Sequence, residues 1–316
     1  MKQSNSTASR HSFVKTRRES NTKMDTIINL GIPHIGEQIF QNLKIGDLVR
    51  CREVSTTWKV LVENAAFKKW KDSILVSFEK GKTEIIKILL EHPKSETIDW
   101  NVKDRHGRSA LIIAAKFGHT NLIKLILDHS DGKGIDLNAK TNFGCNAFMM
   151  ACHEGFTDVV QLFLNHSKNK NIDLNARNNL GMTPLISASF FKNYEVVQLL
   201  LNHSNGENID LNAKDNDGYT AFIYACYDYD DDIETVKMFL SYPNSEQIDF
   251  NARDRYGDTG FELACEQGKF EKVELLHEYS TMINIQIPTP RLIFSNEIND
   301  ILRRKTRKKG ELEKTK

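Results

Sequence analysis

Four histidines recur at one spacing, and histidine is a common metal ligand. His92, His129, His166 and His203 are each 37 residues apart. If this spacing reflects stacked helices, equivalent positions lie about 8–10 Å apart, whereas two nitrogens on one zinc ion are each about 2 Å from it. We therefore expect no metal site. Each histidine is expected at a helix C-terminus, where its ring can bond a free carbonyl.

Two other short motifs resemble sites for phosphate and calcium. Gly-Lys-Thr at 81–83 matches the end of a phosphate-binding loop, but Val76 stands where that loop needs its first glycine. The aspartates at 228–232 lack the turn glycine and the terminal glutamate of a calcium loop. No HExxH, GxSxG or GxGxxG motif occurs. We therefore expect a non-catalytic chain without cofactors, with a turn at 81–83 and a solvated acidic loop at 228–232.

Composition and charge exclude several functional classes. The 316 residues are 40% hydrophobic and 27% charged, with a net charge of +1, which fits a soluble protein that can bury a core. No apolar run of 18 residues suggests a membrane span. Residues 1–23 and 291–316 each carry a net +5, so the acidic body between them carries −9. An acidic body argues against direct nucleic-acid binding.

The tails and the cysteines indicate the compartment. Residues 1–26 are Ser-rich and basic, which predicts a disordered tail. Among the five cysteines, Cys152, Cys226 and Cys265 each follow an alanine at one repeated position, which favours a packed helix interior. No CxxC pair occurs, so we expect a reducing compartment, cytoplasmic or nuclear. The basic run at 303–309 fits either a nuclear localisation signal or a solvated tail.

An internal repeat determines the fold class. Gly107, Gly144, Gly181 and Gly218 are each 37 residues apart, and Gly257 follows after 39. An Asp ladder and an Asn ladder keep nearly the same register. Each unit contains two short helical patterns, and only stacked copies can bury their apolar faces. We therefore expect an all-α solenoid of about six helix pairs.

The domain boundaries follow from the repeat. A degenerate first copy, expected to cap the array, falls at 71–100, and Phe294, Ile298 and Ile301 have the spacing of a capping helix at the other end. The expected divisions are a tail at 1–26, a helical module at 27–70, an array at 71–287 with full repeats at 101–137, 138–174, 175–211, 212–250 and 251–287, and a capping helix with a basic tail at 288–316.

The repeats resemble the ankyrin repeat. Thr-Pro-Leu-Ile-Ser-Ala at 183–188 is similar to the family pattern T-P-L-H-x-A, and other copies read TAFIYAC and SALIIAA. The family period is about 33 residues, and the extra residues lie in the turn after the second helix. The resemblance implies a module that binds another macromolecule.

Residues 27–70 resemble an F-box instead. The matching positions are Ile32-Pro33, Ile39-Phe40, Asp47-Leu48, Val54-Ser55 with Trp58, and Trp70, which predict three short helices. The resemblance implies docking on the adaptor of cullin-RING ubiquitin ligases. The apolar positions that would contact the adaptor or shape that surface are Pro33, Ile35, Ile39, Phe40, Leu43 and Leu48.

Ankyrin proteins usually bind partners through their turn tips and the exposed side of the first helices, so the resemblance also implies a substrate-binding face. Aromatic and apolar residues at the tips suit an interface, and nearby aspartates favour a protein segment carrying Lys or Arg next to apolar residues. The expected residues are Phe117, Phe143, His153, Leu180, Met182, Phe190, Phe191, Tyr219, Tyr227, Asp230, Asp231, Asp232 and Tyr256.

Together the two resemblances imply the substrate receptor of a ubiquitin ligase. The alternative is an ankyrin scaffold or regulatory protein with no ubiquitin role. Co-purification of the adaptor distinguishes the two.

Overall fold

The computed structural model describes residues 74–130, 133–204, 209–227, 233–282 and 298. It divides the chain into two units, residues 1–99 and residues 100–316. The F-box-like segment and the basic run at 303–309 lie outside the described residues. None of the described helices is long and apolar enough to cross a membrane.

In the first unit, the described part is one helix pair. Helix α5 (Ile74–Glu79) and helix α6 (Thr83–Glu91) pack on each other, and a short 3-10 helix, η2 (Ser95–Thr97), follows. The turn between them passes through Gly81, which has a φ of 60°. The Gly-Lys-Thr motif is therefore a turn between two helices, as its sequence context predicted.

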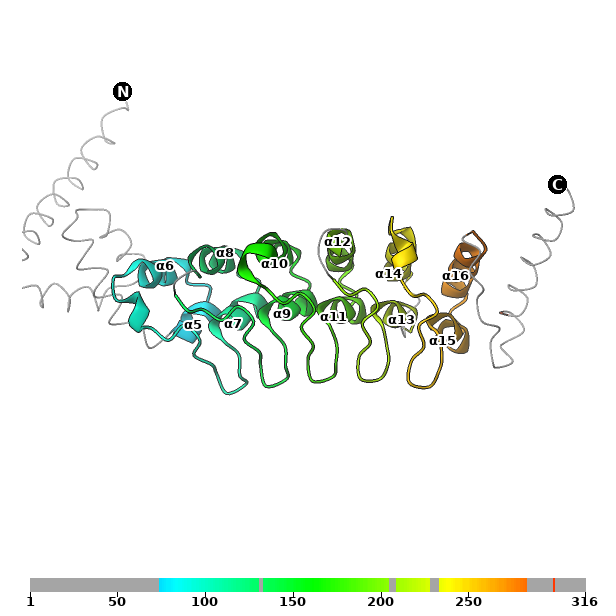
Figure 1. The fold of residues 1–316 in the computed structure, drawn as a ribbon, viewed down its shortest axis with the longest axis horizontal. Helices are drawn as coiled ribbons and strands as arrows, with labels where there is room; N and C mark the ends of the chain where they lie inside the picture. The colour runs from blue at the N-terminus through cyan, green and yellow to red at the C-terminus, as the bar shows by residue number, and fades with distance from the viewer. Residues whose placement is uncertain (1–73, 131–132, 205–208, 228–232, 283–297, 299–316) are drawn as a thin grey trace, which may run out of the picture. The chain divides into compact units, whose positions relative to one another are not determined.

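The second unit contains five helix pairs in its described part, so the two units together describe the six pairs that the repeat predicted (Figure 1). The first helices form one row: α7 (Ala110–Lys116), α9 (Ala147–Glu154), α11 (Pro184–Phe190), α13 (Ala221–Cys226) and α15 (Gly260–Glu266). The second helices form another: α8 (Thr120–His129), α10 (Thr157–Lys170), α12 (Tyr194–Ser204), α14 (Glu234–Ser241) and α16 (Phe270–Met282), with the 3-10 helix η3 (Ser245–Gln247) after α14.

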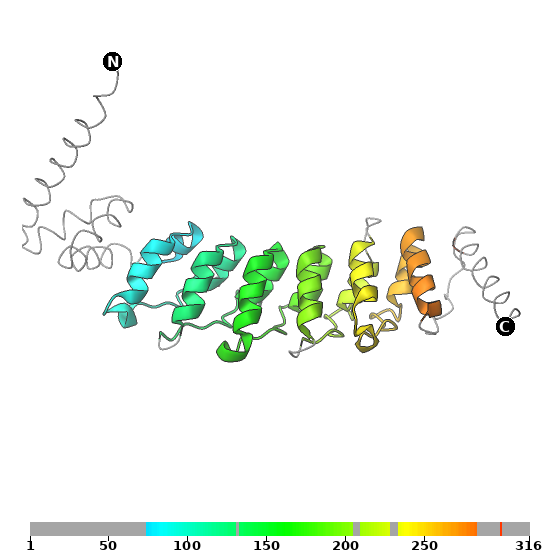
Figure 2. The same ribbon diagram turned by 90° about the horizontal axis from the view of Figure 1, so that it is seen from above.

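The second helices lie side by side along the array (Figure 2). The described residues contain no β-strand, only two isolated bridges, Lys103 with Ser109 and Arg253 with Thr259. The all-α fold is therefore confirmed.

Each first helix begins at a polar residue that caps it. The N-cap side chains of Asn146 and Thr259 accept the backbone N–H three residues on, and Glu262 completes a capping box with Thr259. Ser109, Thr183 and Thr220 do the same in the other repeats. Such caps satisfy N–H groups that lack a partner within the helix.

Small side chains let the first helices approach one another closely. An almost fully buried alanine recurs at the same position of every helix in this row: Ala114, Ala151, Ala188, Ala225 and Ala264. Cys152, Cys226 and Cys265 follow at the next position and are buried, as predicted. Burial raises the pKa of the Cys226 and Cys265 thiols to about 12, so they are protonated hydrophobic groups near neutral pH.

The Asn ladder bonds the start of each repeat to its end, where the chain leads into the next repeat. Asn138 donates from Nδ2 to the carbonyl of Asn171 at 2.8 Å and accepts at Oδ1 from the backbone N–H of Asp173 at 2.8 Å. Asn101 makes the equivalent pair of bonds with Gly134 and Asp136. The Asp ladder acts across the boundary between repeats: Oδ1 of Asp173 accepts the backbone N–H of Asn175, the first residue of the next repeat, at 3.0 Å. Both ladders are therefore structural.

The histidine ladder is also structural where its bonds are described. The Nδ1 atoms of His129 and His166 lie 2.9 and 2.8 Å from the carbonyls of Leu125 and Leu162, four residues earlier in their helices. His92 differs, because its Nδ1 accepts the backbone N–H of Lys94 at 3.0 Å. In the part of the chain that the structure describes, no three His, Cys, Asp or Glu side chains gather as a metal site would need.

Candidate protein-binding surface

The loops that precede the first helices all project to the same side of the array (Figure 1). We call the tips of these loops, together with the exposed ends of the first helices, the turn face. Each loop turns at a glycine with positive φ, such as Gly107 at 73° and Gly218 at 84°. An added Cβ at Gly218 would lie 2.8 Å from the backbone nitrogen of Arg255 in the next loop. Glycine is therefore required both for the turn and for close stacking.

One polar side chain closes each loop on itself. Oδ1 of Asp215 accepts the backbone N–H groups of Asp217 and Tyr219, both at 2.9 Å. Asp104, Thr141, Asn178 and Asp254 accept the equivalent pairs in the other repeats. These bonds satisfy backbone N–H groups that would otherwise need water, because the loop has no neighbouring strand to accept them.

Neighbouring loops are bonded tip to tip. The backbone N–H of Asn179 donates to the carbonyl of Phe143 at 2.9 Å, and its Nδ2 donates to the carbonyl of Asn142, also at 2.9 Å. Asn142 and Asn216 make the same two bonds with the preceding loop. At the last loop, Arg255 forms an ion pair with Asp217 instead. The tips therefore form a continuous ordered edge.

A basic ladder supports this edge, and sequence reasoning missed it. The side chains of Lys103, Lys140, Arg177 and Lys214 each donate to a backbone carbonyl of the following repeat. Each member lies 37 residues from the next, so the same search that found Gly, Asp and Asn would have found it. These basic side chains stabilise the stack, because each donates a hydrogen bond to the following repeat.

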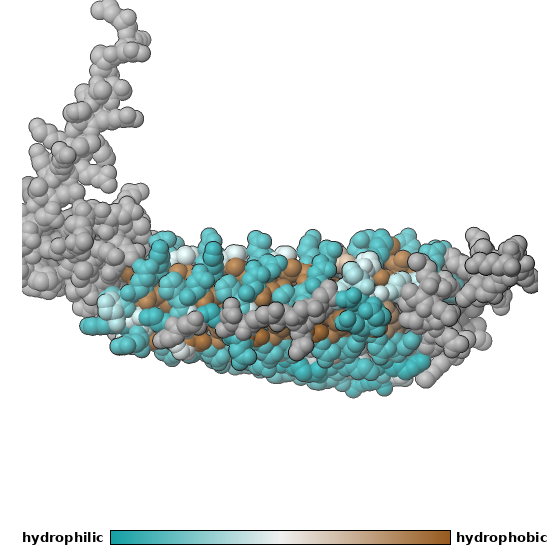
Figure 3. Space-filling model, turned by 45° about the horizontal axis from the view of Figure 1, so that its top comes forward, coloured by the Kyte–Doolittle hydropathy of each residue, from teal (hydrophilic) through white to brown (hydrophobic). Residues whose placement is uncertain are grey.

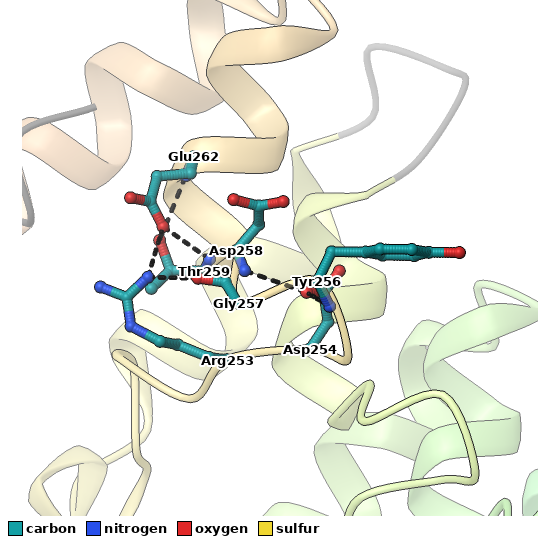
Figure 4. A network of polar contacts seen from close by, with 7 residues as sticks. All are labelled: Arg253, Asp254, Tyr256, Gly257, Asp258, Thr259 and Glu262. Carbon is teal, nitrogen blue, oxygen red and sulfur yellow. Dashed lines mark hydrogen bonds and ion pairs between the residues drawn. The ribbon is translucent and has the colours of Figure 1, made fainter. Parts of the chain in front are cut away.

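The last loop adds a polar network around one buried carboxylate (Figure 4). Oε2 of Glu262 accepts bonds from the Thr259 hydroxyl at 2.9 Å and from its backbone N–H at 2.8 Å, and lies 3.0 Å from Nη1 of Arg253. The Glu262 side chain is 4% exposed, and a buried carboxylate needs such partners. The network anchors the loop whose tip carries Tyr256.

Three loop tips expose large apolar groups. Phe143 and Tyr256 are each 70% exposed and Leu180 is 65% exposed. Among the described residues from Val102 onward, the other exposed large hydrophobic side chains are Val102, Phe117, Phe190, Phe191 and Phe270. Only Phe270, at the start of α16, lies away from the loops and first-helix ends. Exposed apolar surface is therefore concentrated on the turn face.

The side of the second helices differs. In Figure 3 this side is mainly hydrophilic, and hydrophobic residues lie between hydrophilic ones. Contiguous exposed apolar groups mark interaction surfaces in soluble proteins. The positions of the exposed apolar residues therefore favour the turn face as the binding side.

Six of the rings near the ends of the first helices form a continuous row across three repeats. Ring centroids are 4.0 Å apart for His153 and Phe191, 4.8 Å for Phe191 and Phe190, and 5.2 Å for Phe190 and Tyr224. Tyr219 continues the row, 5.0 Å from Tyr224 and 5.6 Å from Tyr227. We call these six residues the aromatic row. Phe117 lies apart from it, stacked on His119.

Two carboxylates border the aromatic row. The hydroxyl of Tyr224 donates to Oδ2 of Asp215 at 2.6 Å. Burial, followed by the bond to Asp215, raises the pKa of Tyr224. Burial and the carboxylate of Asp254 raise the pKa of Tyr219 to about 12. Both tyrosines are therefore neutral donors at physiological pH.

One residue expected on the binding face is buried. Met182 was expected on the binding face, but it is 7% exposed; its backbone N–H is held by Asn178 at 3.0 Å, and its side chain turns into the core. Asp215 is buried too: it is 8% exposed and closes its own loop. Asp230, Asp231 and Asp232 lie outside the described residues, as do Pro33, Ile35, Ile39, Phe40, Leu43 and Leu48.

Comparison with known proteins identifies the family. A family model described as ankyrin repeats (3 copies) matches residues 53–141, 131–215 and 205–287, which is more than half of the chain. The chain therefore belongs to the ankyrin-repeat family. A model of the F-box domain matches residues 33–70. The protein is, more specifically, an F-box/ankyrin-repeat protein.

Solved structures show the same fold. The chain resembles the crystal structure of EF0377, an ankyrin repeat protein, with a TM-score of 0.56, 24% identity, and coverage of 65% of this chain and 96% of that one. It also resembles the ankyrin repeat domain of Bcl-3, described as a unique member of the IkappaB protein family, with a TM-score of 0.61, 22% identity, and coverage of 73% and 97%. No curated protein matches the chain.

Proposed function

We propose that this chain is the substrate-recognition subunit of a cullin-RING (SCF-type) ubiquitin ligase. One observation carries the proposal: an F-box match at 33–70 is joined directly to an ankyrin array. Both modules are non-catalytic protein-interaction modules. A chain that joins them has one surface for a ligase adaptor and another for a protein to be modified.

The proposed mechanism is proximity. The receptor holds the substrate near a charged ubiquitin-conjugating enzyme and so raises the effective concentration of substrate lysines there. The chain supplies binding and orientation, and other subunits of the ligase supply the chemistry. Adaptor docking is proposed for Pro33, Ile35, Ile39, Phe40, Leu43 and Leu48.

Substrate binding is proposed for the turn face. Its exposed apolar tips at Phe143, Leu180 and Tyr256 are suited to act as anchors, because aromatic anchors dominate many interfaces. The aromatic row extends this surface onto the first helices. The aspartates Asp230, Asp231 and Asp232 follow Tyr227 closely in the sequence and would attract a basic segment of the substrate.

A cytoplasmic and nuclear location is part of the proposal. The basic run at 303–309 fits a nuclear localisation signal. Replacing its six Lys and Arg residues with alanine should lower the nuclear fraction of the protein. An unchanged nuclear fraction would remove this part of the proposal.

The function is tested by affinity purification of the full chain from cells with the proteasome inhibited, followed by mass spectrometry. We expect the adaptor and a cullin to co-purify, together with proteins that accumulate only under inhibition. A Leu48→Asp variant purified in parallel should lose the adaptor and the cullin but keep the accumulated proteins. Purification of the wild-type chain without the adaptor would favour a scaffold with no ubiquitin role.

A further inference from the structure

A pocket opens between two neighbouring first helices of the array. It has a volume of about 200 Å³ and is lined by Ser189 and Phe190 of α11, by Tyr224 and Ala225 of α13, and by Lys192, Tyr227 and Thr235. Three of these residues belong to the aromatic row. We call this space the α11–α13 pocket. Its walls are aromatic, and it lies on the side where the array exposes its apolar residues.

One helix turn beside the pocket departs from the repeat. At Gly118 and Gly155, which have positive φ, an added Cβ would lie 2.7 Å from Phe156 and 2.6 Å from Asn193 of the following repeat. Lys192 occupies the equivalent position one repeat later, with a φ of 58°, and its side chain lines the pocket. A side chain is thus accommodated where the two preceding turns have none. A left-handed non-glycine residue is costly and is often found at functional sites.

One residue that lines the pocket carries a buried, unsatisfied hydroxyl. Ser189 is 3% exposed, and its Oγ has no hydrogen-bond partner among the described residues. Buried hydroxyls are nearly always hydrogen-bonded, because leaving one unpaired is unfavourable. If Ser189 changes rotamer when a side chain enters the pocket, its hydroxyl can bond to a polar group on that side chain.

Size restricts what can enter. Pockets for drug-sized ligands and cofactors usually enclose about 300–1,000 Å³, so a space of about 200 Å³ suits one large side chain of a partner. Aromatic walls favour an aromatic ring, since offset and edge-to-face contacts add to area burial. Tyrosine and tryptophan also carry a polar edge that can reach Ser189.

The charge of the array around the pocket indicates which residues flank that side chain in the partner. Residues 175–287 contain eight Lys/Arg and nineteen Asp/Glu, a net charge of −11. Residues 101–174 contain nine Lys/Arg and seven Asp/Glu, a net charge of +2. Beyond the pocket, Glu266 is exposed on α15, and Asp217 is exposed as well but pairs with Arg255. Burial and the nearby carboxylates of Asp258, Glu262 and Asp254 raise the pKa of Glu266, which reports a negative field on the last repeat.

We propose that the α11–α13 pocket receives one tyrosine or tryptophan side chain from a substrate segment that carries Lys or Arg close by. The basic residues lie toward α15, over the acidic last repeat, and away from Lys192. This inference rests on the proposed substrate role of the turn face and names the chemistry of the segment. Substrates would be distinguished by an aromatic anchor with basic residues on one side of it.

The probe is a phage-displayed library of random 12-residue peptides, selected on the full-length chain. We expect enrichment of peptides with Tyr or Trp and with Lys or Arg on one side of it. Their affinity should fall at least tenfold with Phe190→Ala, which removes an exposed pocket wall. Ser189→Ala should reduce the preference for Tyr over Phe by at least threefold. Phe270→Ala, which removes a similarly exposed ring at the start of α16, away from the turn face, should change affinity less than twofold.

Three results would overturn the inference: no enrichment, enrichment of acidic peptides, or enriched peptides whose affinity is unchanged by Phe190→Ala. Circular dichroism and thermal melting confirm that each variant is folded. Adaptor binding is measured on the same preparations. A chain that binds the adaptor but fails the peptide test keeps the proposed function and loses the pocket assignment. A chain that passes the peptide test but does not bind the adaptor keeps the pocket assignment and loses the proposed function.

Discussion

The hydroxyl of Tyr224 donates a 2.6 Å hydrogen bond to Oδ2 of Asp215, which ties helix α13 to the loop that precedes it. The other oxygen of Asp215 already holds two backbone N–H groups of that loop. A single buried carboxylate therefore fixes both the loop tip and one ring of the aromatic row. The proposed binding surface and the fold share this residue.

Replacing Tyr224 with phenylalanine should lower the free energy of unfolding. The ring remains, but Oδ2 of Asp215, in a residue that is 8% exposed, loses its donor. Leaving a buried acceptor unpaired costs about 1–3 kcal/mol. Urea denaturation measures the change. Tyr256→Phe is the matched control, because Tyr256 is 70% exposed, and equal stability changes in the two variants would contradict this role for the bond.

The bonds of Asn138 to the end of its repeat give a second prediction. Asn138→Ala removes two bonds of 2.8 Å to the segment that leads into the next repeat and should cost about 1–3 kcal/mol, because two backbone groups lose their partner. Asn165→Ala removes only a bond from Gln161 within α10 and should have little effect. Thermal or urea unfolding compares them, and an unaffected Asn138→Ala protein would show that the Asn ladder does not hold the stack.

Glu266 predicts a pH dependence of stability. Burial, Asp258, Glu262 and Asp254 raise its pKa, so folding favours the protonated carboxyl and the ionised form is destabilising. That cost is present at pH values above the raised pKa and disappears as the pH falls through it. Glu266→Gln should therefore stabilise the protein at pH 7 by roughly 0.5 kcal/mol and have no effect at acid pH.

The control for this prediction is Glu271→Gln. Glu271 lies in the first turn of α16, where a carboxylate interacts favourably with the helix dipole, so its removal should not stabilise the protein. Stability is measured by urea denaturation from pH 4 to 8. A Glu266→Gln gain that persists unchanged at the acid end would contradict the electrostatic cause.

The exposed tips give a prediction that separates binding from folding. The double variant Phe143→Ala with Tyr256→Ala removes two side chains that are each 70% exposed, so the free energy of unfolding should change by less than about 0.5 kcal/mol each. If these rings are anchors, dissociation of an identified substrate should become at least tenfold faster. Surface plasmon resonance measures the rates, and an unchanged rate would remove the tips from the binding surface.

Much of the fold was predictable because each repeat uses the same bonds. Gly144 and Asn138 recur at fixed spacing. A residue that makes the same contact in every repeat is usually of the same type in every repeat, so it appears at a constant interval in the sequence. The Lys103 ladder was equally visible, and it was missed because a basic residue in a turn resembles an ordinary surface residue.

The binding surface was less predictable, because spacing does not give side-chain direction. Met182 and Tyr219 occupy the same position in consecutive repeats, yet Met182 is buried and Tyr219 is only partly buried. The bond between Tyr224 and Asp215 joins residues nine apart and has no equivalent ladder. The pocket beside them is lined by Lys192, where the repeat departs from glycine, and the spacing of Lys192 in the sequence does not show which residues surround it.

The receptor function is tested most directly by titrating the purified full-length chain with the purified ligase adaptor in a calorimeter. We expect a one-to-one complex, and we expect Leu48→Asp to weaken it by at least about 2 kcal/mol, or roughly 30-fold, as loss of a buried interface anchor does. Leu180→Asp, the same change at a 65% exposed loop tip, should leave adaptor affinity unchanged. Absence of binding by the folded wild-type chain, or equal binding by a folded Leu48→Asp variant, would contradict adaptor docking through this segment.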